Sequence, residues 1–530
     1  MLKNTLLHSS FFLLCSMFLI LIISNISFFF NIEINIFNIL ISLLLSLIAL
    51  IYLVKNKIDI IISFIVAALI LLVSYYLALA YFDLSYDGQG YHQETIYLLK
   101  NGWNPLREQT LAFRPWINHY QKANEIIQSN IYLLTNKIES GKMINILFIF
   151  IAFATFFVFI STLKIKNLYR WILSLIVVLN PVVYTQVFTN YIDANWYLTF
   201  VVLLSSLFTY FINRKSIGLA MFILSSVIYC SLKLTSIPVF IIIAVFAFSY
   251  NLYFYKKKII FPLLSIFLFS VICNIHPFIT NVQNGYHILH PFSGSKKSDI
   301  LNQNIPEILL DKNRIERLSV SLFSETSNGT KAIYYEGLKF PFKVNKANIY
   351  LSYDTRLGGF GFLFSGIIAM TFLLLLYLLF LKEEKFYKKT MIIVLSCILF
   401  TILINPACWW ARLSAQIWLL PIIIIIFGLL YKNKVLKLLS QVSLFIFLIN
   451  ILLPGCLSFM ELQNNNAVMN QFVNSIDKNT IILDLSNPRG FQQYYLKFKE
   501  RNIHYKLEKL LNQQEIAPFT PDIIYKIEMK

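Results

Sequence analysis

Uninterrupted runs of leucine, isoleucine, valine and phenylalanine recur along the chain, and short polar segments separate them. A helix needs about 20 apolar residues to cross the hydrocarbon core of a membrane, which is roughly 30 Å thick. The runs are continuous rather than alternating, and a backbone in lipid must satisfy its own hydrogen bonds, so they predict helices. The pattern predicts about 13 transmembrane helices, near residues 10–30, 36–54, 59–81, 143–163, 169–188, 195–212, 216–233, 236–254, 259–279, 360–381, 389–406, 412–431 and 436–457.

The short connections between these runs alternate in charge. If Lys3 lies in the cytoplasm, every second connection is basic, which is the bias that cytoplasmic loops show. The basic connections contain Lys55 and Lys57; Lys164, Lys166 and Arg170; Arg214 and Lys215; Lys256 to Lys258; Lys382 to Lys389; and Lys432 to Lys437. Three long segments, residues 82–142, 280–359 and 458–530, then fall on the non-cytoplasmic side.

The fold class that follows is an all-α polytopic membrane protein with a small external C-terminal α/β domain. Residues 1–457 would form the transmembrane domain, including external loops 82–142 and 280–359, and residues 458–530 the C-terminal domain. In the latter, the patterns at 480–485 and 522–525 are typical of strands, and the stretch that ends near Arg501 is typical of a helix. We expect loop 82–142 to form short amphipathic helices on the membrane surface.

Composition supports a membrane protein and argues against two function classes. Hydrophobic residues make up 58% of the 530 residues and charged residues only 13%, which is too apolar for a soluble domain. The net charge of +19 is spread over the short connections and forms no single basic patch, so we expect no nucleic-acid partner. The chain has no Walker A loop, so nothing supports ATP-driven transport.

The segment after the third apolar run carries the densest candidate chemistry. Asp87, Tyr91, His92 and Glu94 follow one another within eight positions, and Asp83 marks the end of the span. Carboxylates at a membrane boundary are costly unless they are solvated or functional. A wet loop with capping aspartates is the structural interpretation, and a catalytic carboxylate is the functional one. Asp87 is the better candidate, and Asp83 is expected to matter less.

Five motifs occur in one order along the chain. They are Asp87-x-x-x-Tyr91 with Gly102-Trp103-Asn104-Pro105, then Asn118 to Glu125, Thr189 to Asn195, Ser231 to Thr235, and Trp409 to Gln416. This order resembles the membrane glycosyltransferases of the GT-C superfamily, above all the aminoarabinose-transferase and protein O-mannosyltransferase branch. Gly88 stands where that branch usually has glutamate, and Ala123 and Asn124 stand where it has two prolines.

The resemblance implies sugar transfer at the outer face of a bacterial inner (plasma) membrane. Such enzymes take the sugar from a polyprenyl-phosphate donor with inversion, and a carboxylate accepts the proton of the acceptor hydroxyl. The acceptor would be a lipid-linked glycan, a polysaccharide or a protein. On this resemblance the catalytic residues are Asp87 and Asp193, and the substrate-binding residues are Tyr91, His92, Glu94, Lys122, Lys233 and Arg412.

Lys233 and Arg412 are the candidate ligands of the donor phosphate, because each is a lone cation at an outer span end. Snorkelling of the side chain to the lipid headgroups is the structural alternative for both. Asp87, Glu94 and Asp193 together have the chemistry to bind a divalent cation, and the pattern leaves open whether one is needed.

Two other functions fit a chain with many spans and large outer loops. An O-antigen polymerase or ligase tends to rely on outer-loop arginines, here Arg314, Arg317 and Arg356, of which the last stands apart. A transporter or flippase for lipid-linked glycans is expected to have repeat-related halves and broken helices near the membrane midplane, and the sequence shows no internal repeat. A purely structural membrane protein is the third alternative.

Overall fold

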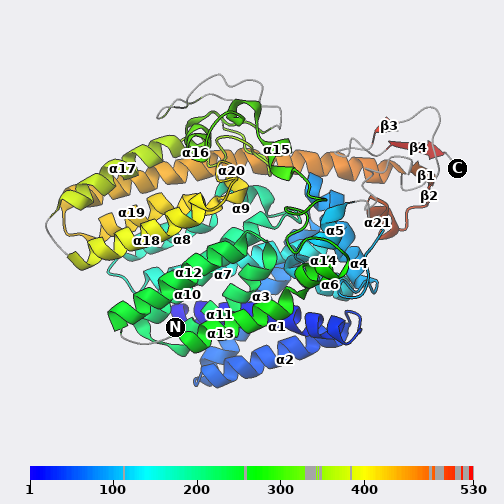
Figure 1. Cartoon of the computed structure of the whole chain (residues 1–530), viewed down its shortest axis with the longest axis horizontal. Helices are drawn as coiled ribbons and strands as arrows, with labels where there is room; N and C mark the ends of the chain where they lie inside the picture. The colour runs from blue at the N-terminus through cyan, green and yellow to red at the C-terminus, as the bar shows by residue number, and fades with distance from the viewer. Residues whose placement is uncertain are drawn as a thin grey trace.

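The computed structural model describes residues 1–111, 114–255, 259–328, 349–381, 385–476, 480–483, 494–507, 515–516 and 524–528, together with Lys339, Phe342 and Val344. Residues 256–258 and 382–384, which belong to two of the basic connections, lie outside the described residues. Where it is described, the chain is mostly helical (Figure 1).

The N-terminal part begins with three long apolar helices, α1 (Leu2–Phe29), α2 (Ile36–Leu53) and α3 (Lys57–Leu79). Helix α1 packs against α2, α3, α7 and α11 and is mostly buried, whereas α2 and α3 leave most of their apolar side chains exposed. Apolar side chains that no protein atom covers are typical of a lipid-facing surface. The short elements that follow are a π-helix (Gly88–His92), α4 (Gln93–Lys100), α5 (Pro115–His119), α6 (Ala123–Thr135) and a 3₁₀ helix (Ile138–Lys142).

The middle of the chain contains eight helices: α7 (Met143–Ile160), α8 (Asn167–Val178), α9 (Pro181–Gln186), α10 (Asp193–Asn213), α11 (Ser216–Leu232), α12 (Ser236–Tyr255), α13 (Ile260–Cys273) and α14 (Ile275–Gln283). Two expected spans are broken. The span expected at 169–188 divides before Pro181, because proline has no N–H and disfavours a helical residue before it. The span expected at 259–279 bends by 52° between α13 and α14.

The last part contains two short helices, α15 (Ile300–Asn304) and α16 (Arg314–Phe323), a 3₁₀ helix (Glu307–Leu309), and four further helices: α17 (Phe364–Phe380), α18 (Lys385–Leu403), α19 (Leu419–Leu430) and α20 (Lys434–Ile476). Two 3₁₀ turns, Ala411–Leu413 and Ala415–Trp418, lie between α18 and α19. Helix α20 runs along one edge of the bundle beside α17 (Figure 1). The predicted domain boundary at 457/458 falls inside α20, because the helix continues in a polar segment after the apolar run ends.

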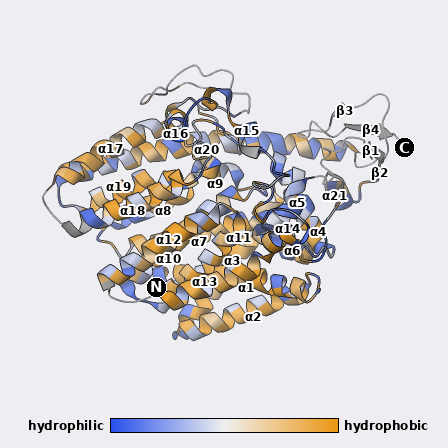
Figure 2. Ribbon diagram, in the orientation of Figure 1, coloured by the Kyte–Doolittle hydropathy of each residue, from blue (hydrophilic) through white to orange (hydrophobic). Residues whose placement is uncertain are grey.

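Seven of the described helices are long and apolar enough to cross a membrane, or eight if the bent pair α13 and α14 is one span. Four shorter apolar segments lie among them: α8, α11, α17 and residues 415–430. Hydrophobic residues dominate the long helices, as Figure 2 shows. The protein is therefore a helical membrane protein by length and composition, while the number of 13 spans and their orientation stay predictions.

The C-terminal segment carries a small sheet beyond the end of α20 (Figure 1). Its strands are β1 (Thr480–Leu483), β2 (Tyr505–Leu507), β3 (Glu515–Ile516) and β4 (Ile524–Glu528), in the order β2-β1-β4-β3. Strand β1 pairs with β2 in parallel and with β4 antiparallel. A helix, α21 (Tyr494–Lys499), precedes β2. A self-contained α/β domain stays a prediction, because much of residues 477–530 lies outside the described part.

Helix α6 does not lie on a surface, contrary to the expectation for loop 82–142. Its residues 123–130 are all buried, and it packs against α1, α2 and α11. Polar side chains in this buried stretch find polar partners, as when Gln128 donates to Asn190 and Asn130 donates to Ser24. Loop 82–142 is therefore built into the bundle at α6.

Candidate active site

Four of the sequence-predicted residues meet in one place although they lie far apart in the chain. Asp87 immediately precedes the π-helix after α3, and Asp193 is the first residue of α10. Lys233 follows the last residue of α11, and Arg412 lies in the 3₁₀ turn after α18. Each element thus contributes a residue at its end, and the shared location requires these four ends to lie on the same side of the bundle.

The Arg412 guanidinium holds the group together. Its Nη2 lies 3.1 Å from Asp87 Oδ2, its Nε 3.5 Å from Asp193 Oδ2 and its Nη1 3.3 Å from Asp354 Oδ1. Lys233 Nζ forms an ion pair with the other oxygen of Asp193. Arginine suits this position because its planar fork presents several N–H groups in fixed directions. Both cations are bound to carboxylates in this structure.

Two charged residues that the sequence analysis did not assign to the site complete it. Asp354 contacts Arg412, and its other oxygen lies 2.8 Å from Arg356 Nη2. Arg356 stands apart from the other outer-loop arginines in the sequence. In the structure Arg356 and Arg412 both contact Asp354. We call Asp87, Asp193, Lys233, Asp354, Arg356 and Arg412 the Arg412 cluster. Its three cations and three carboxylates balance, which reduces the cost of burying each charge.

Aromatic rings lie against the two arginines of the Arg412 cluster. The Arg412 guanidinium lies 4.8 Å from the Tyr191 ring centre and 4.5 Å from that of Trp410, and Arg356 lies 3.9 Å from the same Trp410 ring. Such cation–π contacts favour a charge that is partly removed from water. Burial raises the pKa of Tyr91 well above the ordinary value. The nearby Asp87 carboxylate adds to this shift, and the Arg412 guanidinium opposes it. Tyr91 therefore stays protonated and can donate a hydrogen bond.

His92 and Lys122 belong to a second buried group, centred on Glu125. His92 Nδ1 lies 2.6 Å from Glu125 Oε1. Lys122 Nζ donates to the carbonyl oxygens of Trp116 and Tyr120 at 3.1 and 2.7 Å. Burial lowers the pKa of Lys122 to about 8, although Glu125 opposes this shift. The ring centres of Tyr91 and His92 lie 4.2 Å apart, so this buried group contacts Tyr91.

Asp83 is a structural carboxylate, because hydrogen bonds occupy both of its oxygens. Its Oδ1 accepts from the backbone N–H and the hydroxyl of Ser85 at 2.9 and 2.5 Å, and its Oδ2 accepts from the backbone and side-chain N–H groups of Asn190 at 2.7 Å each. Asp83 thereby joins the Asp87 loop to the segment before Asp193. A side chain at Gly88 would collide with Asp83 and Ser85, which explains glycine where the resembled family has glutamate.

Glu94 lies in the first turn of α4, beyond the π-helix. Together with Asp87 and Asp193 it was a candidate ligand set for a divalent cation. Among the described residues, no group of three or more His, Cys, Asp or Glu side chains is arranged to hold a metal ion. Asp87 and Asp193 instead bind the cationic side chains named above, so the residues present do not fit a metal site.

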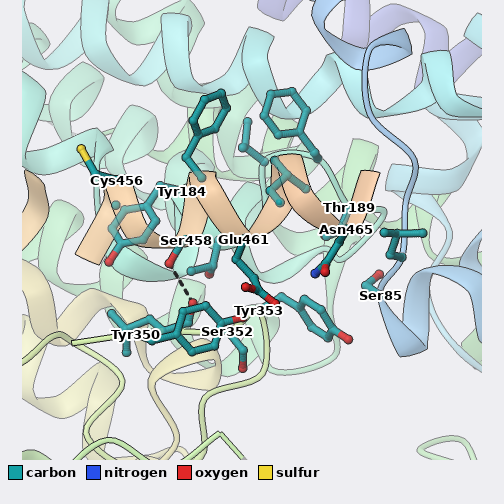
Figure 3. Close-up of a pocket in the computed structure, with 18 of the residues that line it drawn as sticks. Ser85, Tyr184, Thr189, Tyr350, Ser352, Tyr353, Cys456, Ser458, Glu461 and Asn465 are labelled. Carbon is teal, nitrogen blue, oxygen red and sulfur yellow. Dashed lines mark hydrogen bonds between the residues drawn. The ribbon is translucent and has the colours of Figure 1, made fainter. Parts of the chain in front are cut away.

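A cavity of about 400 Å³, shown in Figure 3, is lined in part by Tyr353, the residue before Asp354 of the Arg412 cluster. Side chains of α9, α20 and residues 350–353 line it, and most of this lining is apolar. Ser85 and Thr189 lie toward one end of it and Cys456 toward the other (Figure 3). A small second cavity lined by Arg412 shares Thr185 and Tyr353 with the first. An apolar space and the charged side chains of the Arg412 cluster thus lie next to each other.

Neither a protein-family model nor a curated protein matches the sequence. The assignment of a function therefore depends on the geometry of the Arg412 cluster and its cavity, and on the order of the motifs.

Proposed function

We propose that this protein is a membrane glycosyltransferase of the GT-C type, which transfers a sugar from a polyprenyl-phosphate donor to an acceptor of the cell envelope. The observation that carries the proposal is the convergence of Asp87, Asp193, Lys233 and Arg412 beside a largely apolar cavity. A lipid phosphate needs both features: cations for its headgroup and apolar surface for its chain. We assign the cavity in Figure 3 to the first part of the polyprenyl chain.

In the proposed reaction Asp87 is the general base. The acceptor hydroxyl gives its proton to the Asp87 carboxylate while its oxygen attacks the anomeric carbon of the sugar. The bond from that carbon to the phosphate oxygen breaks, and the configuration at the carbon inverts. Asp87 suits the role because its side chain is 19% exposed, so an acceptor can reach it from the aqueous side.

Arg412 and Lys233 would stabilise the leaving group. The departing polyprenyl phosphate keeps the electrons of the broken bond, and cations placed in advance around that oxygen lower the barrier. In the structure Arg412 is bound to Asp87 and Asp193, and Lys233 is bound to Asp193. A phosphate that binds Arg412 would take over part of these contacts and leave the Asp87 carboxylate free to accept the proton. Donor binding would then prepare the base.

The contacts of the outer-loop arginines favour this reaction over that of an O-antigen polymerase or ligase. Arg314 donates to the backbone oxygen of Leu403 at 2.7 Å, and Arg317 donates to those of Leu309 and Leu310 at 2.9 Å each. Both guanidinium groups thus stabilise the fold of their loop. Arg356 alone of the three reaches the Arg412 cluster.

The test is sugar transfer from a labelled polyprenyl-phosphate sugar into envelope acceptors by membranes that contain the protein. Asp87→Asn keeps the size of the side chain but removes the base, so we expect transfer to fall by about 10²–10⁴ while the protein level is unchanged. Asp311→Asn, an exposed carboxylate of the second outer loop, is the matched control and should transfer normally. Equal activity of the two variants would refute the proposal.

The proposed location of the site is the periplasmic or external face of a bacterial inner membrane. The support is the alternation of basic connections, which puts the ends that carry the Arg412 cluster opposite the basic side. A reporter fused after Lys215 should then be cytoplasmic, and one fused at the C-terminus should be external. Two reporters on the same side would contradict this orientation.

A further inference from the structure

The C-terminal helix α21 lies against the loop that carries Asp87. Phe82, at the start of this loop, packs with Met469, Phe472 and Val473 of α20 and with Phe498 of α21 in a small separate apolar cluster. The backbone N–H of Phe82 donates to Asn466 at 3.0 Å, and Asn466 donates to the carbonyl oxygen of Ala80 at 2.9 Å. The end of α20 and helix α21 thus contact residues that are roughly 400 positions earlier in the chain.

Lys497 is the centre of this contact. Its Nζ donates to the carbonyl oxygen of Asp83 at 3.1 Å and to the side-chain oxygen of Gln89 at 3.0 Å, and it lies 3.9 Å from Glu139. Asp83 is four residues before Asp87, and Gln89 is two residues after it. One ammonium group therefore holds the loop on both sides of the proposed base.

Glu139 and Lys142 hold the same part of the loop. Glu139 accepts from the backbone N–H of Asp83 at 3.0 Å and pairs with Lys142 at 2.5 Å, and Lys142 also donates to the carbonyl oxygen of Tyr81. We call Asp83, Gln89, Glu139, Lys142 and Lys497 the Lys497 cluster. Every hydrogen-bonding group of Asp83 has a partner here, which leaves the backbone before Asp87 little freedom.

A buried lysine is an expensive way to fill space. The Lys497 side chain is only 1% exposed, and burying an ammonium group costs several kcal/mol unless it is well paired. A leucine or methionine would fill the same volume and pack against Phe82 at lower cost. An apolar side chain could not donate hydrogen bonds to both the Asp83 carbonyl oxygen and the Gln89 side-chain oxygen, as Lys497 does. The geometry is therefore suited to fixing a conformation.

We propose that Lys497 is a positioning residue that sets the conformation of the Asp87 loop, so that the C-terminal segment is an integral part of the active site. This inference rests on the proposed function insofar as the loop presents the general base. It goes beyond that function by assigning a role to a segment that the motif order leaves out. Lys497 itself need not touch donor or acceptor, because it acts through the backbone of the loop.

The test compares Lys497→Met with Lys499→Met in the full-length protein. Lys499 lies two residues away on the same helix and is exposed, so its variant removes the same charge without touching the loop. We expect Lys497→Met to lower kcat by up to about 10²-fold, the effect of a small misplacement of a catalytic group. The KM for the donor should not change, because the phosphate-binding cations are untouched. Lys499→Met should match the wild type.

A second readout does not depend on sugar transfer. Loss of one charge-assisted hydrogen bond corresponds to about tenfold faster amide hydrogen exchange, which we expect at residues 84–92 in Lys497→Met alone. If the wild type shows no transferase activity, this exchange experiment still decides the inference about the loop. If Lys497→Met fails to accumulate, Gln89→Leu removes the same contact from the other side. Unchanged exchange at residues 84–92, or a kcat equal to that of Lys499→Met, would overturn the inference.

Discussion

The Asp87 loop takes part in two clusters of charged residues that differ in their access to solvent. In the Arg412 cluster, the side chains of Asp87 and Arg412 are 19% and 16% exposed, and a cavity lies beside them. In the Lys497 cluster, Lys142 is fully buried and Lys497 nearly so. Ion pairs next to a cavity can exchange a partner for a ligand, whereas sealed ones cannot. The first cluster is therefore suited to chemistry and the second to holding the loop.

The difference shows that residue type alone does not separate a catalytic carboxylate from a structural one. Asp83 and Asp87 are four residues apart in the same loop. Asp83 accepts hydrogen bonds from Ser85 and Asn190 with both oxygens, while Asp87 contacts one long cationic side chain. A carboxylate that is to take a proton must be able to change partners, and only Asp87 meets this condition.

After Asp87→Asn, the largest effect is expected from Arg412→Lys in the Arg412 cluster. Lysine keeps the charge, but its single ammonium group cannot contact Asp87, Asp193 and Asp354 at once. Losing one preorganised contact to a developing negative charge costs roughly 10²–10³ in kcat, so we expect a loss of transfer in this range. Membranes with equal amounts of each protein would be compared, and the apparent Tm should fall only slightly. Normal transfer by Arg412→Lys would mean that the cluster binds no phosphate.

Asp83→Asn tests whether the buried Lys497 cluster has a structural role. Asparagine has only one acceptor oxygen. Either the N–H and hydroxyl of Ser85 or the two N–H groups of Asn190 therefore lose their acceptor. Each lost hydrogen bond to a charged acceptor costs about 1.5–3 kcal/mol, and we expect a lower apparent Tm in purified protein. Asp87→Asn is the matched control and should melt like the wild type. If Asp87→Asn were the less stable variant, the two carboxylates would have exchanged roles.

Much of the helical fold can be predicted from the sequence, because continuous apolar runs and basic connections are local signals. The breaks at Pro181 and between α13 and α14 modify these predictions, as does the polar extension of α20. Residues from four motifs meet because helix ends on one side of a bundle come close together. Asp354 and Arg356 were missed as site residues because they lie in a long loop whose path depends on tertiary contacts. Lys497 could not be found at all, since its partners are a backbone oxygen and residues far away in the chain.

A smaller effect than that of Arg412 is expected from Lys233→Ala, because Asp193 is the one ion-pair partner of Lys233 among the described residues. Removing one charge-assisted contact to the phosphate should cost about 1.5–3 kcal/mol of donor binding. The measurement is binding of a labelled polyprenyl phosphate to the purified protein. Lys164→Ala changes an exposed cation between α7 and α8, controls for net charge and should bind normally. Equal affinities for the two variants would return Lys233 to a structural role.

The smallest predicted effect comes from Glu500, at the edge of the Lys497 cluster. Its carboxylate accepts from the backbone N–H of Ile138 at 2.7 Å, and burial raises its pKa to about 7, with Glu139 adding to the shift and Lys137 opposing it. The folded protein therefore keeps a proton that the unfolded chain releases above a pH of about 4.5. This contribution to stability is complete below that pH and is lost as the pH rises toward 7.

Replacing Glu500 by glutamine removes this titration. We expect the apparent Tm of Glu500→Gln to exceed that of the wild type at pH 8 and to match it at pH 4.5, with a difference on the order of 1 kcal/mol. Other titrating groups are common to both proteins, so the difference between the two curves isolates Glu500. Glu108→Gln changes an exposed carboxylate and should follow the wild-type curve. If Glu500→Gln also followed it, the edge of the Lys497 cluster would be open to water, and its contrast with the Arg412 cluster would be smaller than the structure indicates.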